Sequence, residues 1–394
     1  MSKFPLSSEC PPWIHLFRYL RHKRIFIFII LGLLGMELLL QMLLPRILND
    51  NWYLRMYLPW EAIKQTERFL ADKRSLEIDA VLGWKNRANS YIKSVHYDHL
   101  GSRSTANLDL TQRKTKRVVF IGDSRINGHL EVDNNQTINA YLESPEIETF
   151  NFGSAMYHLD QSYLMMQKRI PDLRPEVVVI GLGSKPGYRL SCHYLPFHSR
   201  EETVDMPFIK PRFLLKDGEL SAQIPPYQKL LEKLPNNPLL PRYLKQYDPC
   251  YTQFKQFKRW ESTPLLGFIT KLKIYLQKMQ IFTTVFTSAS SKTMENRELV
   301  IALLRGIQQF ASQHQVQVIF LLFPRSYEYS HQAHDGQTDY AQTRDILQQL
   351  QLTYIDVQQL LGTQSDAVDY YTDSVHFTAT TNHLIANALS HHLQ

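Results

Sequence analysis

Five short apolar runs, rich in β-branched residues, recur along the chain from Arg117 onward. They are RVVFIG at 117–122, EIETFNFG at 146–153, PEVVVIGLG at 175–183, QVQVIFLLFP at 315–324 and LTYIDV at 352–357. Runs of this length and composition predict strands that are buried on both faces. Helical patterns lie between several of them, for example at 295–313 and 343–351. Strands that alternate with helices predict a three-layer α/β fold, in which a doubly wound parallel sheet of five strands lies between helices.

The length and charge of the chain limit its domain organisation and its kinds of binding partner. Its 394 residues are more than one ordinary domain needs, which predicts insertions or a second module. The formal net charge is +7, but the basic residues are interleaved with acids and form no arginine-rich tract or zinc-ligand spacing. We therefore expect no nucleic-acid partner. The turn after the first strand lacks a phosphate-cradling glycine pattern, which argues against a nucleotide binder, and we expect neither a cofactor nor a metal.

An N-terminal apolar segment predicts a membrane anchor. Residues 25–44 are apolar almost throughout, and about 20 such residues let a helix cross a bilayer. The basic stretch RYLRHKR precedes them, so the positive-inside rule places residues 1–24 in the cytoplasm. A cleaved signal peptide is the alternative, but the run exceeds a normal signal core and no small-x-small cleavage site follows. We expect a single-pass membrane protein with an extracytoplasmic main domain, which is periplasmic in a Gram-negative-type bacterium.

Two polar residues, Glu37 and Gln41, lie inside the predicted span, four apart on one helical face. Polar residues in a membrane helix often mark a partner, so self-association or a neighbouring membrane protein is one interpretation. A protonated Glu37 that is tolerated in a single span is the other, and the sequence leaves both open.

The three cysteines fall on both sides of the predicted membrane. Cys10 lies in the predicted cytoplasmic tail, whereas Cys192 and Cys250 lie outside, where disulfides persist. A disulfide between Cys192 and Cys250 and two buried free thiols are both consistent with the sequence.

Two segments depart from the alternation of strands and helices. Residues 45–115 predict a stalk or connector, because a helical pattern near 60–74 is followed by turn formers and a basic stretch. Residues from about 188 to 292 are dense in proline and then basic and aromatic with helical spacing. Because this segment is too long for a plain loop, we expect a helical insertion in the domain of residues 116–394, beside the site as a lid or substrate wall.

A candidate nucleophile follows the first predicted strand, in the segment GDSRINGH. Parallel α/β sheets bind ligands beyond the carboxyl ends of their strands, and Ser124, Gly153 and the 181–187 segment all follow strands. Asp373 and His376 share one loop after the fifth strand, at the same edge of the sheet. A serine hydroxyl needs an imidazole to remove its proton and a carboxylate to orient that imidazole. We therefore predict Ser124 as nucleophile, His376 as base and then acid, and Asp373 as the orienting group.

Other groups near this serine are candidates for supporting roles. The backbone amides of Ser124 and Gly153 are expected to face the oxyanion of the reaction, where one donor is worth about 3 kcal/mol. Arg125 either holds an anionic substrate group or forms a salt bridge at the sheet edge, and we prefer the second interpretation. His129 and His158 also lie near predicted strand ends, and we assign them no role.

These blocks resemble the SGNH or GDSL hydrolases over roughly residues 116–394. GDSRING is similar to the first block of that family, with Ser124 as its serine, and NFGSA to the second, with Gly153 as its oxyanion glycine. DSVH is similar to the last block, with Asp373 and His376. LGWKNRANS and HLGSR look like the segment that precedes the domain in membrane-anchored bacterial members. The resemblance implies a five-stranded parallel sheet between helices, and hydrolysis or transfer of acyl groups on lipids, carbohydrates and other esters.

One block departs from the family pattern. The third block of the family is Gly-x-Asn-Asp, whose asparagine completes the oxyanion hole, but this chain has GLGSKPGYR there. Ser184, Lys185 and Asn127 are candidate substitutes. Losing one donor slows a hydrolase by about a hundredfold, or it marks a member that keeps the fold only for binding.

The sequence as a whole predicts a membrane-anchored serine esterase or O-acyltransferase of SGNH type. Its expected partners are the membrane and an acylated glycan or lipid, with the acyl esters of a cell-envelope polysaccharide or glycolipid as substrate. The alternative is a catalytically inactive SGNH-fold protein that binds glycans or assists envelope assembly. Hydrolase and transferase form the same acyl-serine, so the residues alone do not separate them.

Overall fold

The computed structural model describes residues 28, 31–32, 35, 75–104, 113–187, 190–194, 209–232, 239–251, 296–330, 338–362 and 367–393. The chain divides into two compact units, and the elements below belong to the unit of residues 56–252 and 289–394. Among the described residues, no helix combines the length and the hydropathy that a membrane crossing requires. The predicted span at 25–44, with Glu37 and Gln41, lies outside the described residues except at four positions, so the anchor stays a prediction.

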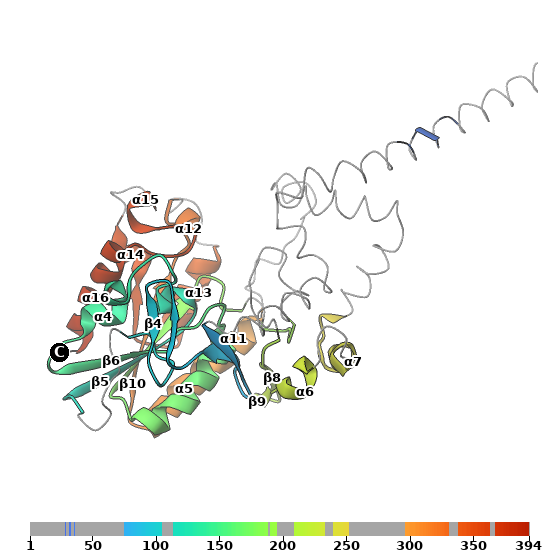
Figure 1. The fold of residues 1–394 in the computed structure, drawn as a ribbon, viewed down its shortest axis with the longest axis horizontal. Coiled ribbons are helices and arrows are strands. Elements are labelled where there is room, and N and C mark those ends of the chain that lie inside the picture. Colours follow the sequence, from blue (N-terminus) through green and yellow to red (C-terminus); the bar gives the residue numbers. More distant parts are fainter. Residues whose placement is uncertain are drawn as a thin grey trace, which may run out of the picture. The chain divides into compact units, whose positions relative to one another are not determined.

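A five-stranded parallel sheet forms the centre of this unit (Figure 1). Its strands are β5 (Lys116–Ile121), β6 (Ile147–Asn151), β7 (Val177–Gly183), β10 (Gln317–Phe323) and β11 (Tyr354–Asp356). They lie in the order β11-β10-β7-β5-β6, and every neighbouring pair is parallel. All five coincide with predicted strands, so the predicted parallel α/β sheet is confirmed.

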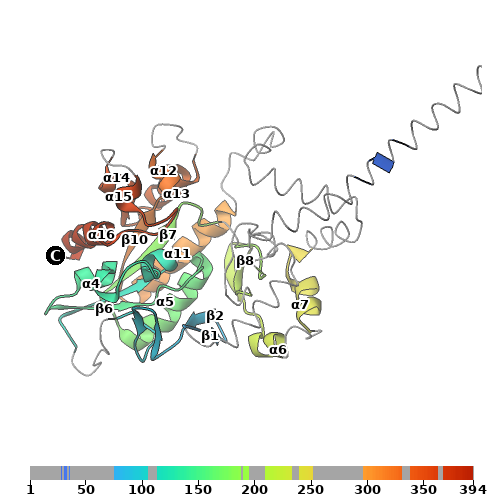
Figure 2. The same ribbon diagram turned by 45° about the horizontal axis from the view of Figure 1, so that its top comes forward.

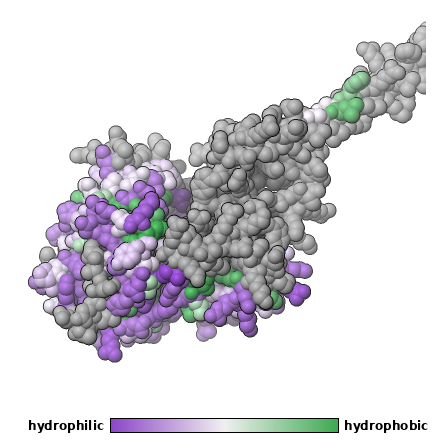
Figure 3. Space-filling model, in the orientation of Figure 1, coloured by the Kyte–Doolittle hydropathy of each residue, from purple (hydrophilic) through white to green (hydrophobic). Residues whose placement is uncertain are grey.

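Helices cover both faces of the sheet (Figure 2). Successive strand residues point to opposite faces, so Val119 packs with α5 (Leu159–Leu173), α11 (Arg297–Gln313) and α13 (Asp339–Gln349). Its neighbour Val118 packs with α4 (Ile138–Leu142), α14 (Val357–Leu361) and α16 (Ala379–Leu393). The helices turn their polar faces outward, and the described surface in Figure 3 is mostly hydrophilic.

The order in which the chain adds strands to the sheet reverses between β5 and β7. β6 lies on one side of β5, whereas β7, β10 and β11 follow on the other. Open α/β sheets bind ligands in the crevice at such a point, beyond the carboxyl ends of the strands. We call this edge the rim. The short elements on the segments that follow β5, β10 and β11 are α3 (Ser124–Asn127), the 3-10 helix η2 (Asn134–Gln136), α12 (Ser326–Ser330) and α15 (Ala367–Tyr370).

The described part of the predicted connector is built into the domain. β1 (Leu76–Asp79), β2 (Gly83–Asn86), β3 (Ser90–Ile92) and β4 (Val95–Tyr97) form two antiparallel hairpins. Leu82 and Trp84 are fully buried in the same core cluster as α5. The indole Nε1 of Trp84 also donates to the carbonyl oxygen of Ala155 at 2.9 Å. Residues from Leu76 onward thus contribute to the same core as the domain that the sequence predicts from residue 116.

The described part of the expected helical insertion contains strands as well as helices. It contains an antiparallel hairpin, β8 (Arg212–Lys216) and β9 (Glu219–Gln223), followed by α6 (Tyr227–Leu231) and α7 (Leu239–Tyr247). The turn between the strands is Asp217–Gly218, and both residues have positive φ, at 52° and 83°. An Asp-Gly pair at this position is a strong hairpin signal. The predicted helices at 252–292 lie outside the described residues.

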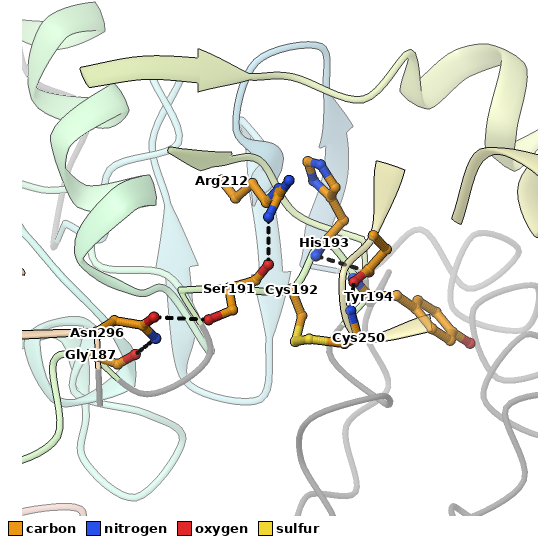
Figure 4. Close-up of a disulfide and its surroundings, with 9 residues drawn as sticks. Gly187, Ser191, Cys192, His193, Tyr194, Arg212, Cys250 and Asn296 are labelled. Atoms are coloured by element: carbon orange, nitrogen blue, oxygen red, sulfur yellow. Dashed lines mark hydrogen bonds between the residues drawn. A yellow bond between two sulfur atoms is a disulfide. The ribbon is translucent and has the colours of Figure 1, made fainter. Parts of the chain in front are cut away.

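A disulfide joins Cys192 to Cys250, with their Cα atoms 5.7 Å apart (Figure 4). Beside it, Asp248 accepts hydrogen bonds from the backbone N–H groups of His193 and Tyr194 at 3.0 and 2.8 Å. Of the two alternatives that the sequence left open, the structure has the disulfide. The bond ties the segment after β7 to the end of α7.

Candidate active site

The segment after β5 folds into a tight turn that presents Ser124 at the rim. Ser124 is the first residue of α3, and Asp123 caps this helix by accepting a hydrogen bond from the backbone N–H of Arg125 at 2.9 Å. The helix packs closely on β7 at Gly181, where a Cβ would lie 2.4 Å from Cγ1 of Ile126. The glycine at this position therefore lets α3 approach the sheet.

Three predicted side chains meet at this point. The Nε2 atom of His376 lies 2.8 Å from Oγ of Ser124, and its Nδ1 atom lies 2.6 Å from Oδ2 of Asp373. The other carboxylate oxygen of Asp373 accepts from the backbone N–H groups of Val375 and His376, at 2.7 and 2.8 Å. With Nδ1–H donated to Asp373, Nε2 is left as the acceptor for the serine proton. This is the geometry that activates a serine hydroxyl.

The electrostatics of the carboxylate suit this role. Burial acts to raise the pKa of Asp373, but the hydrogen bonds from the His376 ring and two backbone N–H groups outweigh it. The pKa of Asp373 therefore lies below its ordinary value, and the side chain is a carboxylate at neutral pH.

The loop of Asp373 and His376 is held at both ends. Tyr371 and Phe377 pair as an isolated antiparallel bridge, which closes the loop into a narrow hairpin between α15 and α16. Thr378 then begins α16, because its Oγ1 accepts from the backbone N–H of Thr381 at 3.3 Å. The base is thus positioned by local backbone structure as well as by Asp373.

His129, to which the sequence analysis assigned no role, lies against the predicted base, His376. Its ring is stacked on that of His376, with the centroids 4.0 Å apart and the planes 12° from parallel. Burial and the neighbouring charge of His376 lower the pKa of His129 to about 4, so this ring is neutral at neutral pH. In the sequence, its only signal is a place near the end of a predicted strand, five residues after Ser124.

Arg103 holds the backbone that carries His129. Its fully buried guanidinium donates to the carbonyl oxygens of Asn127, at 2.9 Å, and of His129 and Val132. Its Nε also donates to Oδ1 of Asn134 at 3.1 Å. Burial lowers the pKa of Arg103 to about 10, so the side chain remains charged at neutral pH. An arginine from the segment that precedes the sheet thus shapes the turn after the nucleophile.

Two of the predicted oxyanion donors make hydrogen bonds within the protein. The backbone N–H of Gly153 donates to Oδ1 of Asn151 at 3.0 Å, and Gly153 does not line the cavity beside Ser124. The side-chain amide of Asn127 donates to the carbonyl oxygen of Gly153 at 2.7 Å and to the hydroxyl of Tyr97 at 3.2 Å. Both amide hydrogens of Asn127 are therefore used within the core, and this side chain supports the 153 turn instead of facing the substrate.

A cavity of about 140 Å³ opens beside Ser124, and its wall supplies other donors. Met156 lines it with a left-handed backbone, at a φ of 63°, and its backbone N–H makes no hydrogen bond to another described residue. Ser184 also lines it, and within the described part of the chain its buried Oγ has no hydrogen-bond partner. Lys185 instead forms an ion pair with Asp339 at 3.1 Å. The N–H groups of Ser124 and Met156 and the hydroxyl of Ser184 are thus the candidate donors to a substrate oxygen.

Arg125 forms the salt bridge that we preferred for it. Its guanidinium pairs with the carboxylate of Asp123 and lies over the ring of Phe323, 5.3 Å from the centroid. Burial acts to raise the pKa of Asp123, but the charge and hydrogen bonds of Arg125 outweigh it and leave the pKa below its ordinary value. The two charges therefore neutralise each other where they line the cavity.

One cluster of side chains has the composition of a metal site. Within the described ranges, Cys192, Asp248 and Cys250 are the His, Cys, Asp or Glu side chains close enough together to share an ion. Both sulfur atoms belong to the disulfide, and Asp248 accepts hydrogen bonds from the backbone. The disulfide and its neighbouring turn therefore explain this cluster.

Comparison with known proteins gives matches among solved structures only. No family model and no curated protein matches the chain. LAE5, an alpha/beta hydrolase enzyme from the metagenome of Lake Arreo in Spain, is 11% identical, over 71% of this chain and 96% of its own, with a TM-score of 0.34. A GDSL-like lipase from Bacteroides thetaiotaomicron is 11% identical, over 73% and 91%, with a TM-score of 0.34. A catalytic mutant of an acetylxylan esterase from Geobacillus stearothermophilus is 10% identical, over 71% and 94%, with a TM-score of 0.33. At this level of likeness, activity has to be inferred from the side chains at the rim.

Proposed function

We propose that the chain is a serine esterase or O-acyltransferase of SGNH type. It is anchored in a membrane by residues 25–44 and acts outside the cytoplasm on acyl esters of a cell-envelope polysaccharide or glycolipid. The observation that carries the proposal is the hydrogen-bonded series from Asp373 through His376 to Ser124. The imidazole and the hydroxyl are 252 residues apart in sequence, and their contact has little structural purpose unless one activates the other.

In the first half-reaction, Oγ of Ser124 attacks the carbonyl carbon of the ester while Nε2 of His376 takes the hydroxyl proton. Asp373 stabilises the imidazolium that forms. The negative charge on the carbonyl oxygen meets the donors of the cavity wall, in a site partly shielded from water. The imidazolium then gives its proton to the departing alkoxide, which leaves an acyl group on Ser124.

In the second half-reaction, a water molecule or a sugar hydroxyl gives its proton to His376 and attacks the acyl carbon. The bond to Ser124 breaks, and its Oγ takes the proton back from the imidazolium. With water the product is a free acid, and with a hydroxyl it is a new ester. Both outcomes use the same residues, so the product depends on whether water or a sugar hydroxyl reaches the acyl group on Ser124.

Other observations support the proposed location of the protein and the proposed type of ester. The apolar run at 25–44 follows a basic stretch, and the Cys192–Cys250 disulfide is of a kind that persists in oxidising compartments. The cavity beside Ser124 is small and lined by several charged and polar side chains. A short acyl group on a hydrophilic carrier suits such a cavity better than a long fatty chain does.

A fluorophosphonate probe tests the proposed chemistry on the full chain in detergent. We expect the probe to label the wild type and Ser390→Ala, a control on the outer part of α16, and to leave Ser124→Ala unlabelled. His376→Gln should label far more slowly, because the serine loses its base. A wild type that unfolds cooperatively but takes up no probe contradicts the proposal.

Binding without chemistry is the second candidate, and one observation favours it. Neither the Gly153 amide nor the Asn127 side chain is available to an oxyanion, and the third block has no asparagine. A glycan-binding or envelope-assembly protein would bind an acetylated glycan equally well as wild type and as Ser124→Ala, and neither would release acetate. Release by the wild type alone excludes this candidate.

A further inference from the structure

The cavity beside Ser124 carries more positive charge than the triad chemistry uses. Arg125, Lys185 and Arg325 line it, against the single carboxylate of Asp123. We propose that this cavity binds an anionic group of the substrate, a carboxylate or a phosphate, and so places the acyl ester at Ser124. The inference rests on the proposed function, because it names the class of substrate for the same site.

Arg125 is not the residue that holds the anion. Its guanidinium faces both oxygens of Asp123, and its side chain is 11% exposed. This pair is neutral as a unit, and both of its residues line the cavity. The charge that remains for a ligand comes from the other two cations.

Arg325 and Lys185 have incomplete partners. Lys185 pairs with Asp339, but 41% of its side chain is exposed and an ammonium group has three protons to donate. Within the described residues, the guanidinium of Arg325 makes no ion pair and no hydrogen bond. Only its backbone N–H is used, in a hydrogen bond to Oε2 of Glu328 at 2.8 Å. Glu328 does not line the cavity.

The two cations are also close enough for their like charges to act on each other. Burial and the charge of Arg325 act to lower the pKa of Lys185, but Tyr327 and Asp339 outweigh them and leave the pKa above its ordinary value, so Lys185 stays charged beside Arg325. An anion between the two cations would interact favourably with both. A guanidinium fork binds carboxylate and phosphate through paired hydrogen bonds, and an ammonium group adds a point charge. The wall therefore has the composition of an anion subsite next to the nucleophile.

Binding can be measured without turnover in the full chain with Ser124→Ala. We expect calorimetry to show binding of oligogalacturonate or of glycerol phosphate. Their neutral counterparts, a xylo-oligosaccharide and glycerol, should bind much more weakly. Adding Arg325→Gln to this variant should raise the Kd of the bound anion at least tenfold. Arg325→Lys should restore part of the loss, and Arg305→Gln on the exposed side of α11 should change nothing. The preferred anion tells a carboxylated glycan from a phosphate headgroup.

Turnover gives the second measurement. We expect acetylated polygalacturonate with free carboxylates to react with at least tenfold higher kcat/KM than the same polymer with methyl-esterified carboxyls. In Arg325→Gln the ratio of the two kcat/KM values should fall towards one. In Arg305→Gln this ratio should equal that of the wild type. A thermal unfolding transition like that of the wild type shows that the variant is folded.

The outcomes separate this inference from the proposed function. Hydrolysis of neutral para-nitrophenyl acetate, with no anion binding and a substrate ratio near one, overturns the subsite and keeps the esterase. Anion binding that depends on Arg325, with no fluorophosphonate labelling and no hydrolysis of any ester, overturns the esterase and keeps the subsite. Binding that is equally strong in Arg325→Gln overturns the assignment to Arg325.

Discussion

At the scale of single residues, the imidazole of His376 is fixed from three directions. Asp373 accepts from Nδ1, Ser124 lies at Nε2, and the ring of His129 lies against its face. Turning the base away from the serine therefore requires the loss of all three contacts together. A base held in this way needs little reorganisation when the proton moves.

Removing the stacked ring tests the third of these contacts. His129→Ala should lower kcat for para-nitrophenyl acetate about three- to tenfold, since a stacked aromatic pair contributes about 0.5–1.5 kcal/mol. KM should change little, because His129 does not line the cavity. His129→Phe keeps a ring at the same positive φ of 50° and should recover most of kcat. Equal kcat values for the two variants would show that stacking has no part in positioning the base.

The meeting of Ser124, Asp373 and His376 could be predicted from sequence, but the donors around them could not. Ser124, Asp373 and His376 follow predicted strands, and their side chains are the types that acyl transfer needs. Whether a backbone N–H faces a cavity depends instead on turn dihedrals and on nearby side chains. Asn151 takes up the N–H of Gly153, and no periodicity in the sequence reveals this.

At the scale of elements, the segment before the sheet stabilises the turn after the nucleophile. Arg103→Met should lower the free energy of unfolding by about 3–5 kcal/mol, because several buried carbonyl oxygens lose a charged donor. It should also lower kcat, since the same turn carries His129. Urea unfolding and ester kinetics measure the two effects, and Arg305→Met is the matched exposed control. A variant with full stability would mean that water or another group replaces the guanidinium.

The insertion contains a buried histidine that makes stability depend on pH. His193 is fully buried beside the disulfide, and burial lowers its pKa to about 4, whereas the unfolded value is about 6.5. As the pH falls below about 6.5, the unfolded chain takes up a proton that the folded chain does not accept until the pH nears 4, so stability is lost within this window. The loss amounts to about 3 kcal/mol at most.

Replacing this histidine isolates its share of the loss. His193→Asn keeps a side-chain donor for the carbonyl oxygen of Lys210, which lies 2.8 Å from the ring Nδ1, but it does not titrate. Between about pH 7 and pH 4.5, the variant should lose about 2–3 kcal/mol less than the wild type in urea unfolding. His391→Asn at the exposed end of α16 is the control. An identical pH dependence in the wild type and His193→Asn counts against a neutral buried ring.

At the scale of the whole molecule, the alternation of strands and helices was enough to predict the central sheet and its functional edge. Strands buried on both faces are apolar throughout, and a parallel sheet brings their carboxyl ends to one rim. The contribution of the preceding hairpins could not be predicted in this way. Trp84 reaches its partner Ala155 across 71 residues, and packing over such a separation leaves no periodic signal in the sequence.

The disulfide acts at this scale because it closes a long loop. Cys192 and Cys250 are 58 residues apart, and a crosslink over a loop of this size stabilises the folded chain by about 4 kcal/mol, mainly by restricting the unfolded chain. Reduction, or replacement of both residues by serine, should lower the free energy of unfolding by about that amount. Cys10→Ser, outside this loop, should leave it unchanged. Full stability after reduction, verified by thiol titration, would contradict this role and would remove one support for a location in an oxidising compartment.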